Sequence, residues 1–144
     1  EELRLEMQGR GVVFDSTNDS EVIAHLIAEN LHLGLVDAVR ATMERIRGAY
    51  SLAILTDDQV VGVRDPYGVR PLCLGRLGND RWVLASETCG LNTVGATFVR
   101  ELIPGEIVVI GADGWRSVGG QPMQRQALCM LETIYFARPD SQMY

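Results

Sequence analysis

The sequence predicts an α+β domain, with helices segregated to one face of an antiparallel sheet. Two observations indicate this class. Apolar residues recur at helical spacing between residues 22 and 46, and short apolar or β-branched runs separated by Asp, Gly and Pro turns occupy residues 50 to 118. Since the helical part precedes a series of strands, helices and sheet are expected to form separate layers.

The helical part begins at residues 3–7, where a short helix is expected to end at Gly9. Residues 12–14 are apolar and predict a short strand. A second helix includes residues 22–27, and a third runs from about residue 35 to residue 47 with its apolar side chains on one stripe.

The turn before the second helix carries two suitable N-cap residues, Asn18 and Asp19. Glu21 follows Asn18 by three residues, which is where a capping box places its carboxylate. The sequence therefore predicts a side-chain cap at the start of this helix.

The strands are expected in six apolar runs, bounded by turn signals such as Pro104-Gly105. These runs are residues 50–55, 60–63, 82–86, 98–99, 106–110 and 115–118. The link at residues 64–72 contains two Arg, one Asp, two Pro and one Gly. Its backbone path is strongly restricted, and its arginines can hold that path by pairing with Asp65 or with main-chain carbonyls.

Composition sets limits on function. With 144 residues, 47% of them hydrophobic, we expect one domain or most of one. A net charge of −6 without a basic cluster argues against nucleic-acid partners and acidic membranes, and no apolar run reaches transmembrane length. Three widely spaced cysteines without a CxxC pair are typical of a reducing compartment, so we expect a cytoplasmic protein.

The chain is also expected to be a fragment. It begins at Glu1 without an initiator Met and ends at Tyr144, and neither end is typical of a natural terminus. The alternative explanation is a trimmed tag.

Six segments then occur in a recognisable order: residues 17–26, 47–50, 64–72, 85–89, 104–106 and 135–141. With them the chain resembles the glutaminase domain of the amidophosphoribosyltransferase family, which are class II glutamine amidotransferases. The resemblance covers nearly the whole chain. The segment Tyr135-Phe136-Ala137-Arg138-Pro139-Asp140-Ser141 is the discriminating one.

Alternatives remain open, because two of the segments are shared more widely. Residues 17–22 also resemble glucosamine-6-phosphate synthase, and residues 65–72 also resemble asparagine synthetase. A third alternative is a non-catalytic domain that kept the same fold.

The resemblance implies an incomplete N-terminal-nucleophile hydrolase fold, an αββα sandwich with two helices on an antiparallel sheet. Residues 1–134 would be the C-terminal part of the glutaminase domain, and residues 135–144 would start the connection to a phosphoribosyltransferase domain. The implied reaction transfers ammonia from glutamine to 5-phosphoribosyl diphosphate in purine synthesis. The implied cofactor is Mg²⁺, bound in the phosphoribosyl half, and the implied assembly is a homo-oligomer, either a dimer or a tetramer.

The family's catalytic groups are not matched in this chain. The family uses an N-terminal cysteine whose α-amine is the base, and an Asn-Gly pair in the oxyanion hole. Residue 1 here is Glu1, no cysteine lies near it, and no Asn-Gly pair occurs. No residue of this chain is therefore expected to be catalytic, and we expect the 144 residues alone to be inactive.

One substrate-binding residue is implied. Asp19 matches the family's aspartate that binds the α-amino group of glutamine, while Asn18 stands where the family usually has Ser. A short carboxylate at this turn can pair with an ammonium ion. The competing interpretation is that Asp19 only caps the helix.

Cys129 is the one candidate metal ligand. In cluster-bearing members of the family, a cysteine at this place is one ligand of a 4Fe–4S cluster, whose other three cysteines lie in the phosphoribosyl half. Members without a cluster also carry a cysteine here, so both interpretations are open. This chain alone cannot hold a cluster that needs four thiolates.

Overall fold

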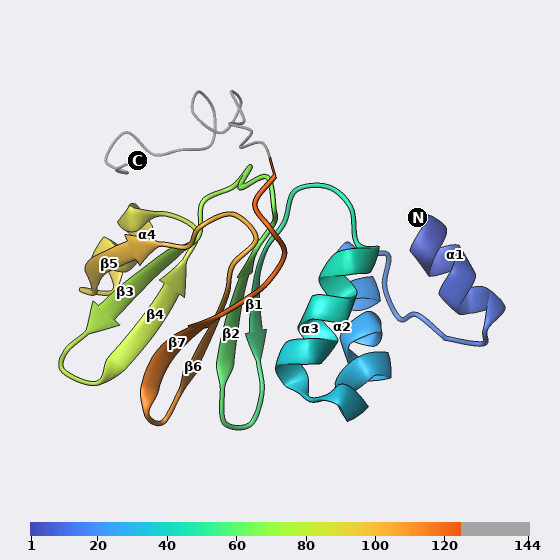
Figure 1. Ribbon diagram of the computed structural model, residues 1–144, viewed down its shortest axis with the longest axis horizontal. Helices are drawn as coiled ribbons and strands as arrows, with labels where there is room; N and C mark the ends of the chain where they lie inside the picture. The colour runs from blue at the N-terminus through green and yellow to red at the C-terminus, as the bar shows by residue number, and fades with distance from the viewer. Residues whose placement is uncertain (125–144) are drawn as a thin grey trace. The chain divides into compact units, whose positions relative to one another are not determined.

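The computed structural model describes residues 1–124, and it forms two compact units that divide between Arg47 and Gly48. Cys129 and the predicted domain boundary at residues 134–135 lie outside the described residues. Figure 1 shows the helices of the first unit and the strands of the second. Each unit has its own hydrophobic core.

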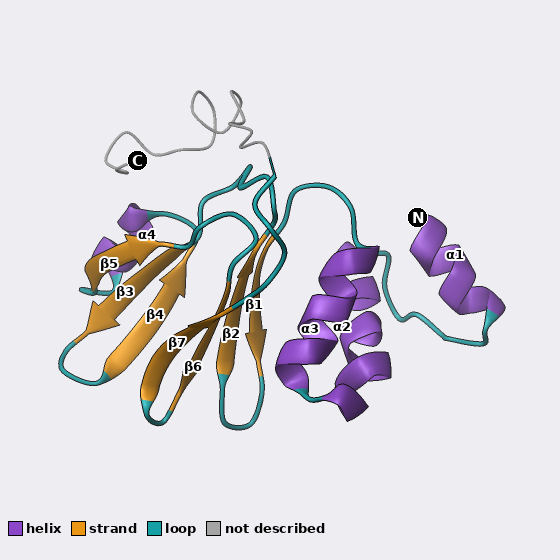
Figure 2. Ribbon diagram, viewed as in Figure 1, coloured by secondary structure: helices purple, strands orange, loops and turns teal. Residues whose placement is uncertain are grey.

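The first unit is helical (Figure 2). It contains α1 (Glu2–Gly9), α2 (Asp19–Asn30), the short 3₁₀ helix η1 (Leu31–Leu33) and α3 (Leu35–Arg45). The three α-helices match the predicted ones in place. Its core joins Met7 of α1 to Val22 and Leu26 of α2.

The strand predicted at residues 12–14 is wrong, because these residues form a loop. Val12 and Phe14 pack against the core of the first unit instead, and the amide of Val12 donates to the carbonyl of Met7 at the end of α1. Their apolar side chains therefore serve helix packing rather than strand pairing.

The second unit is a sandwich of two antiparallel sheets. The strands are β1 (Ser51–Leu55), β2 (Val60–Arg64), β3 (Cys73–Leu77), β4 (Arg81–Ala85), β5 (Thr97–Glu101), β6 (Ile107–Gly111) and β7 (Gly114–Val118). One sheet has the order β1-β2-β6-β7 and the other has the order β4-β3-β5. The six predicted runs all became strands, which confirms the α+β class.

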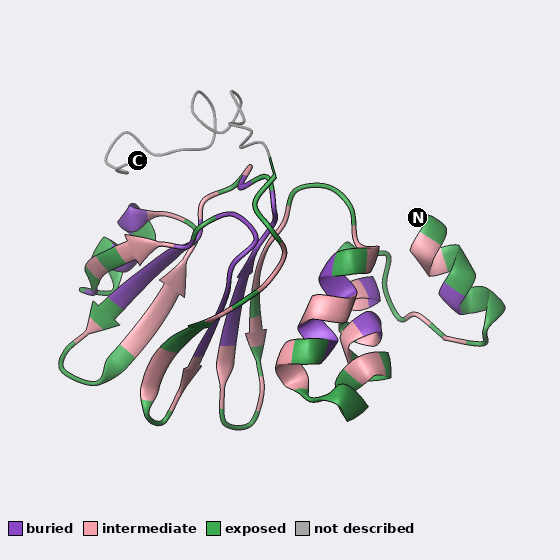
Figure 3. Cartoon of the chain, viewed as in Figure 1, coloured by how far each residue is buried: buried purple, intermediate pink, exposed green. Residues whose placement is uncertain are grey.

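The sandwich is held by side chains from both sheets. Leu74 of β3 and Val108 of β6 are buried, and half-buried Trp82 and Trp115 pack against them. Figure 3 shows that buried residues concentrate in β2, β3 and β6. Gly62 of β2 allows Leu84 of the other sheet to pack closely against it, since a Cβ there would lie 2.8 Å from Cδ1 of Leu84.

Two elements of this unit were not predicted, β3 and the short helix α4 (Thr88–Thr93). Gly75 and Arg76 interrupt the apolar pattern of β3. Gly75 is needed there because a Cβ would lie 2.6 Å from Cδ2 of Leu91 in α4. Cys73 and Cys89 are both buried; Cys73 is the first residue of β3, and Cys89 lies in α4.

Within residues 1–124, no helix combines the length and the apolar character needed to cross a bilayer.

Candidate functional site

The turn before α2 determines how Asp19 is presented. Asn18 is the N-cap, with φ −73° and ψ 136°, and its side-chain oxygen accepts a 2.9 Å hydrogen bond from the amide of Ser20. Capping is therefore the role of Asn18, and the carboxylate of Asp19 is not used for it.

Asp19 is the first residue of α2, and it is exposed. Within residues 1–124, its carboxylate has no hydrogen bond and no ion pair. A carboxylate beside the N-terminus of a helix is stabilised by the helix dipole, and both oxygens here remain available to a cation. The arrangement can therefore hold an ammonium group.

Glu21 has a different role from the one predicted. Its carboxylate accepts the amides of Asp15 and Ser16, at 2.7 and 2.9 Å, and the hydroxyl of Ser16 at 2.6 Å. No hydrogen bond joins it to the amide of Asn18 within the described residues, so the capping box is not formed. The hydrogen bonds from the Ser16 hydroxyl and the Asp15 amide hold the pKa of Glu21 below its usual range.

Arg4 of α1 binds main-chain carbonyls of the same turn. Its Nη1 donates to the carbonyl of Ser16 at 2.6 Å, and its Nη2 donates to the carbonyl of Asn18 at 2.9 Å. The guanidinium also lies over the ring of Phe14, 4.4 Å from the centroid. Arg4 was missed from the sequence, because no local pattern relates it to residues that lie twelve and fourteen positions further along the chain.

His25 packs within the first unit. It is half-buried in α2, and its ring packs edge-on against Phe14 with 5.0 Å between centroids. Its position supports the packing of this unit.

The link at residues 64–72 is a scaffold, as expected. Arg64 is 5% exposed, and it donates to the main-chain carbonyls of Gly68, Arg70 and Leu102. Its ionic partner is Glu101, at 2.6 Å. The fully buried Asp65 accepts the amide of Tyr67 through Oδ1 at 2.9 Å.

Two buried polar atoms near this link have no hydrogen-bond partner within the described residues, the Oδ2 of Asp65 and the hydroxyl of Tyr50. Burial and the negative charge of Asp65 raise the pKa of Tyr50 to about 12. Tyr50 is therefore a neutral phenol at physiological pH and cannot act as a base.

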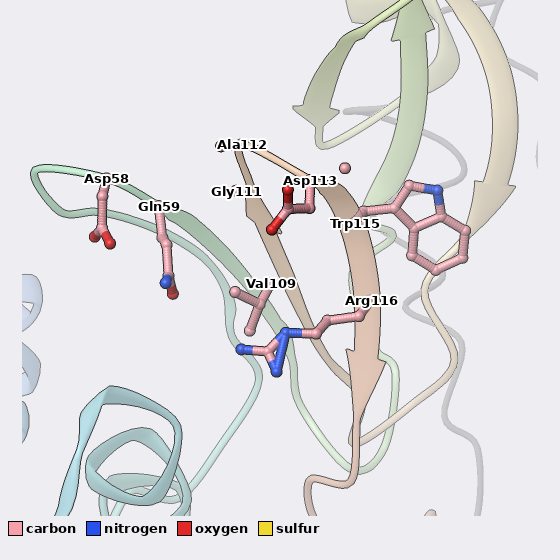
Figure 4. A pocket seen from close by; sticks show the side chains of 9 residues that line it. Asp58, Gln59, Val109, Gly111, Ala112, Asp113, Trp115 and Arg116 are labelled. Carbon is pink, nitrogen blue, oxygen red and sulfur yellow. The ribbon is translucent and has the colours of Figure 1, made fainter.

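A hollow of about 410 Å³ lies on the second unit, between the β1–β2 turn and the β6–β7 hairpin (Figure 4). Asp58 and Gln59 line one side, and Asp113 and Arg116 line another. The side chains of Trp115 and Arg116 leave β7 in opposite directions. The hollow contains none of the predicted site residues.

Neither described cysteine is suited to nucleophilic catalysis. Cys73 is 3% exposed, and its pKa is raised to about 11 by burial and by the charge of Glu101. Cys89 is 8% exposed.

Residues 1–124 do not by themselves form a metal or cluster site. No three His, Cys, Asp or Glu side chains in the described part of the chain lie close enough together to hold a metal ion. The chain has three cysteines, whereas a 4Fe–4S cluster needs four thiolates. Any such group would need ligands from outside residues 1–124.

Comparison with known proteins gives consistent results. Residues 1–93 match the model of the glutamine amidotransferase domain family. Amidophosphoribosyltransferase from Bacillus subtilis is 39% identical over 140 residues, which cover 97% of this chain and 29% of the relative. The chloroplastic amidophosphoribosyltransferase of Glycine max is 43% identical over 141 residues, which cover 98% of this chain and 25% of the relative. The chain thus spans less than a third of the length of these relatives.

The fold of this chain is similar to that of a solved structure over nearly its whole length. Glutamine phosphoribosylpyrophosphate amidotransferase from B. subtilis, complexed with ADP and GMP, matches with a TM-score of 0.91 and 39% identity. The match covers 98% of this chain and 31% of that chain. It confirms the predicted N-terminal-nucleophile hydrolase fold.

Proposed function

This chain belongs to the glutamine amidotransferase domain family, and on that premise we propose that it is part of an amidophosphoribosyltransferase. Such an enzyme transfers ammonia from glutamine to 5-phosphoribosyl diphosphate, and it releases glutamate, diphosphate and 5-phosphoribosylamine for purine synthesis. The proposal is supported by relatives of that name at 39% to 43% identity over nearly all of this chain.

The observation that carries the proposal is the free carboxylate of Asp19. Asn18 caps α2, so the negative charge of Asp19 is left to pair with the α-ammonium of glutamine. This contact orients glutamine without taking part in bond cleavage. In this chain the residues bind and orient the substrate, and we place the nucleophile, its base and the oxyanion donors in other parts of the protein.

The same proposal includes Mg²⁺ in the phosphoribosyl half, a homo-oligomeric assembly and, where a 4Fe–4S cluster is bound, Cys129 as one of its ligands. Within the described residues the relevant groups do not fit a metal site. No step of glutamine binding is therefore assigned to a metal here.

The test is an assay of the full-length protein with glutamine and a choice of ammonia acceptors. 5-Phosphoribosyl diphosphate with Mg²⁺ should give phosphoribosylamine and glutamate in equal amounts. Glutamate formed with aspartate and ATP, or with fructose 6-phosphate, would instead identify an asparagine synthetase or a glucosamine-6-phosphate synthase. Absence of glutamate with every acceptor would favour the non-catalytic alternative.

The 144-residue chain gives a second test. It has no cysteine before Cys73, so by itself it should release no glutamate from glutamine above a blank. Release of glutamate by the purified chain would overturn the placement of the nucleophile elsewhere.

A further inference from the structure

Residues 15–18 form the turn that leads into α2. Side chains bind both main-chain amides and main-chain carbonyls of this turn. Glu21 accepts the amide hydrogens of Asp15 and Ser16. Arg4 donates to the carbonyls of Ser16 and Asn18. Ser16 thus has its amide bound by a carboxylate and its carbonyl bound by a guanidinium.

We propose that Arg4 and Glu21 are positioning residues that fix the direction of the Asp19 carboxylate toward the α-ammonium of glutamine; this inference rests on the proposed function. The side chain of Asp19 has no support of its own within residues 1–124, so its direction is set by the backbone of the turn that precedes it. Charge-assisted hydrogen bonds to both ends of that turn restrict its peptide planes.

The same contacts distinguish the roles of Arg4, Glu21 and Asp19. The carboxylate of Glu21 already accepts three hydrogen bonds, from two amides and the hydroxyl of Ser16. The guanidinium of Arg4 is occupied by two carbonyls and by the ring of Phe14. Of the two acidic residues in the first turn of α2, Asp19 is therefore the one left for substrate, and Arg4 and Glu21 act through it.

Arg4 is suited to this task because its planar guanidinium can serve two carbonyls at once. Both contacts are short, at 2.6 and 2.9 Å. A lysine would supply a single point of charge and could not hold both carbonyls with the same geometry. Arg4→Lys should therefore restore only part of the function that Arg4→Gln loses.

The experiment uses the full-length protein with Arg4→Gln, Arg4→Lys and Glu21→Gln. Arg10→Gln is the matched control, because Arg10 is the C-cap of the same helix, α1, but pairs with the side chains of Glu6 and Glu29 and not with the turn. For each protein we would measure KM and kcat with glutamine, and the rate of synthesis with ammonia in place of glutamine.

Arg4→Gln and Glu21→Gln should raise KM for glutamine about tenfold, in line with loss of a hydrogen bond to a charged group. The KM of Arg4→Lys for glutamine should lie between that of Arg4→Gln and that of the unmodified protein. Ammonia-dependent synthesis should be unchanged in all variants, since ammonia does not need the glutamine-binding site. Arg10→Gln should match the unmodified protein in every reaction.

Three results would overturn the inference. KM values for Arg4→Gln and Glu21→Gln equal to that of Arg10→Gln would show that the turn does not need these contacts. An equal fall in the glutamine and ammonia reactions would show a purely structural role. If the unmodified protein forms no phosphoribosylamine from glutamine, the proposed function itself fails and this inference fails with it.

Discussion

The guanidinium of Arg64 in β2 forms an ion pair with the carboxylate of Glu101 in β5, with 2.6 Å between Nη1 and Oε1. The two strands belong to different sheets. The side chains are 5% and 22% exposed, so the pair is mostly shielded from water. Because Arg64 also binds three main-chain carbonyls, it ties the 64–72 link to both sheets.

Replacing Arg64 by Gln should lower the free energy of unfolding by about 3 kcal/mol, because loss of one partner leaves the other charge and several carbonyls buried without compensation. Chemical denaturation checks this value. Arg81→Gln is the control, since Arg81 is exposed on β4 and should change stability by no more than about 0.5 kcal/mol. Equal effects for the two variants would contradict a structural role for the Arg64–Glu101 pair.

Gly105 should tolerate no side chain. Its φ is +80°, and a Cβ there would lie 2.2 Å from the carbonyl oxygen of Gln121. Gly78 has a similar φ of +65°, but a Cβ there meets nothing within 4 Å. Gly78→Ala should therefore cost about 1 kcal/mol from the backbone conformation alone, and Gly105→Ala should cost clearly more. Melting curves of the two variants, compared directly, separate the steric effect from the conformational one.

Stability should decrease in acid, partly through Glu106. Burial acts to raise the pKa of this carboxyl, but hydrogen bonds from Arg100, Ser117 and the amide of Ile103 outweigh it and lower the pKa. A lowered pKa stabilises the fold above the pKa of the unfolded chain, and this contribution is lost as the pH falls through the folded value.

Glu106→Gln should therefore lower stability at pH 7 and flatten its dependence on pH below about 4.5, the ordinary pKa of a glutamate. Denaturation midpoints measured across this range provide the check. A variant with the same pH dependence as the unmodified protein would mean that other carboxyl groups account for acid unfolding.

Much of the fold could be predicted because it depends on local signals. Apolar runs between Pro104-Gly105 and similar turns fixed six strands, and helical spacing placed α1 to α3. The features that local signals could not predict depend on contacts between residues far apart in the sequence. Gly75 in β3 is explained only by Leu91 of α4, and Val12 serves helix packing although its run is typical of a strand.

At the candidate site, too, local signals could predict some residues and not others. The motif around Asp19 singled out that residue, but it did not decide between capping and substrate binding. The structure assigns capping to Asn18. Arg4 could not have been found from spacing, because its partners Ser16 and Asn18 lie twelve and fourteen positions further along the chain.

Asp19→Asn is the most direct test of the binding site. In the full-length protein this change should raise KM for glutamine and reduce kcat/KM about tenfold to a hundredfold, because a neutral amide keeps the shape but loses the charge that pairs with the ammonium group. Synthesis with ammonia should be nearly unchanged. Steady-state kinetics with each nitrogen source measure both effects.

Asp37→Asn is the matched control for this change, since Asp37 is an exposed acidic residue in the first turn of α3 that pairs with Arg40 at 2.6 Å. It should leave both reactions as they are in the unmodified protein. If Asp19→Asn lowered the glutamine and ammonia reactions together, Asp19 would be a structural residue. If Asp19→Asn behaved like Asp37→Asn, the carboxylate at the start of α2 would not contact glutamine, because loss of its charge would then have no effect on binding.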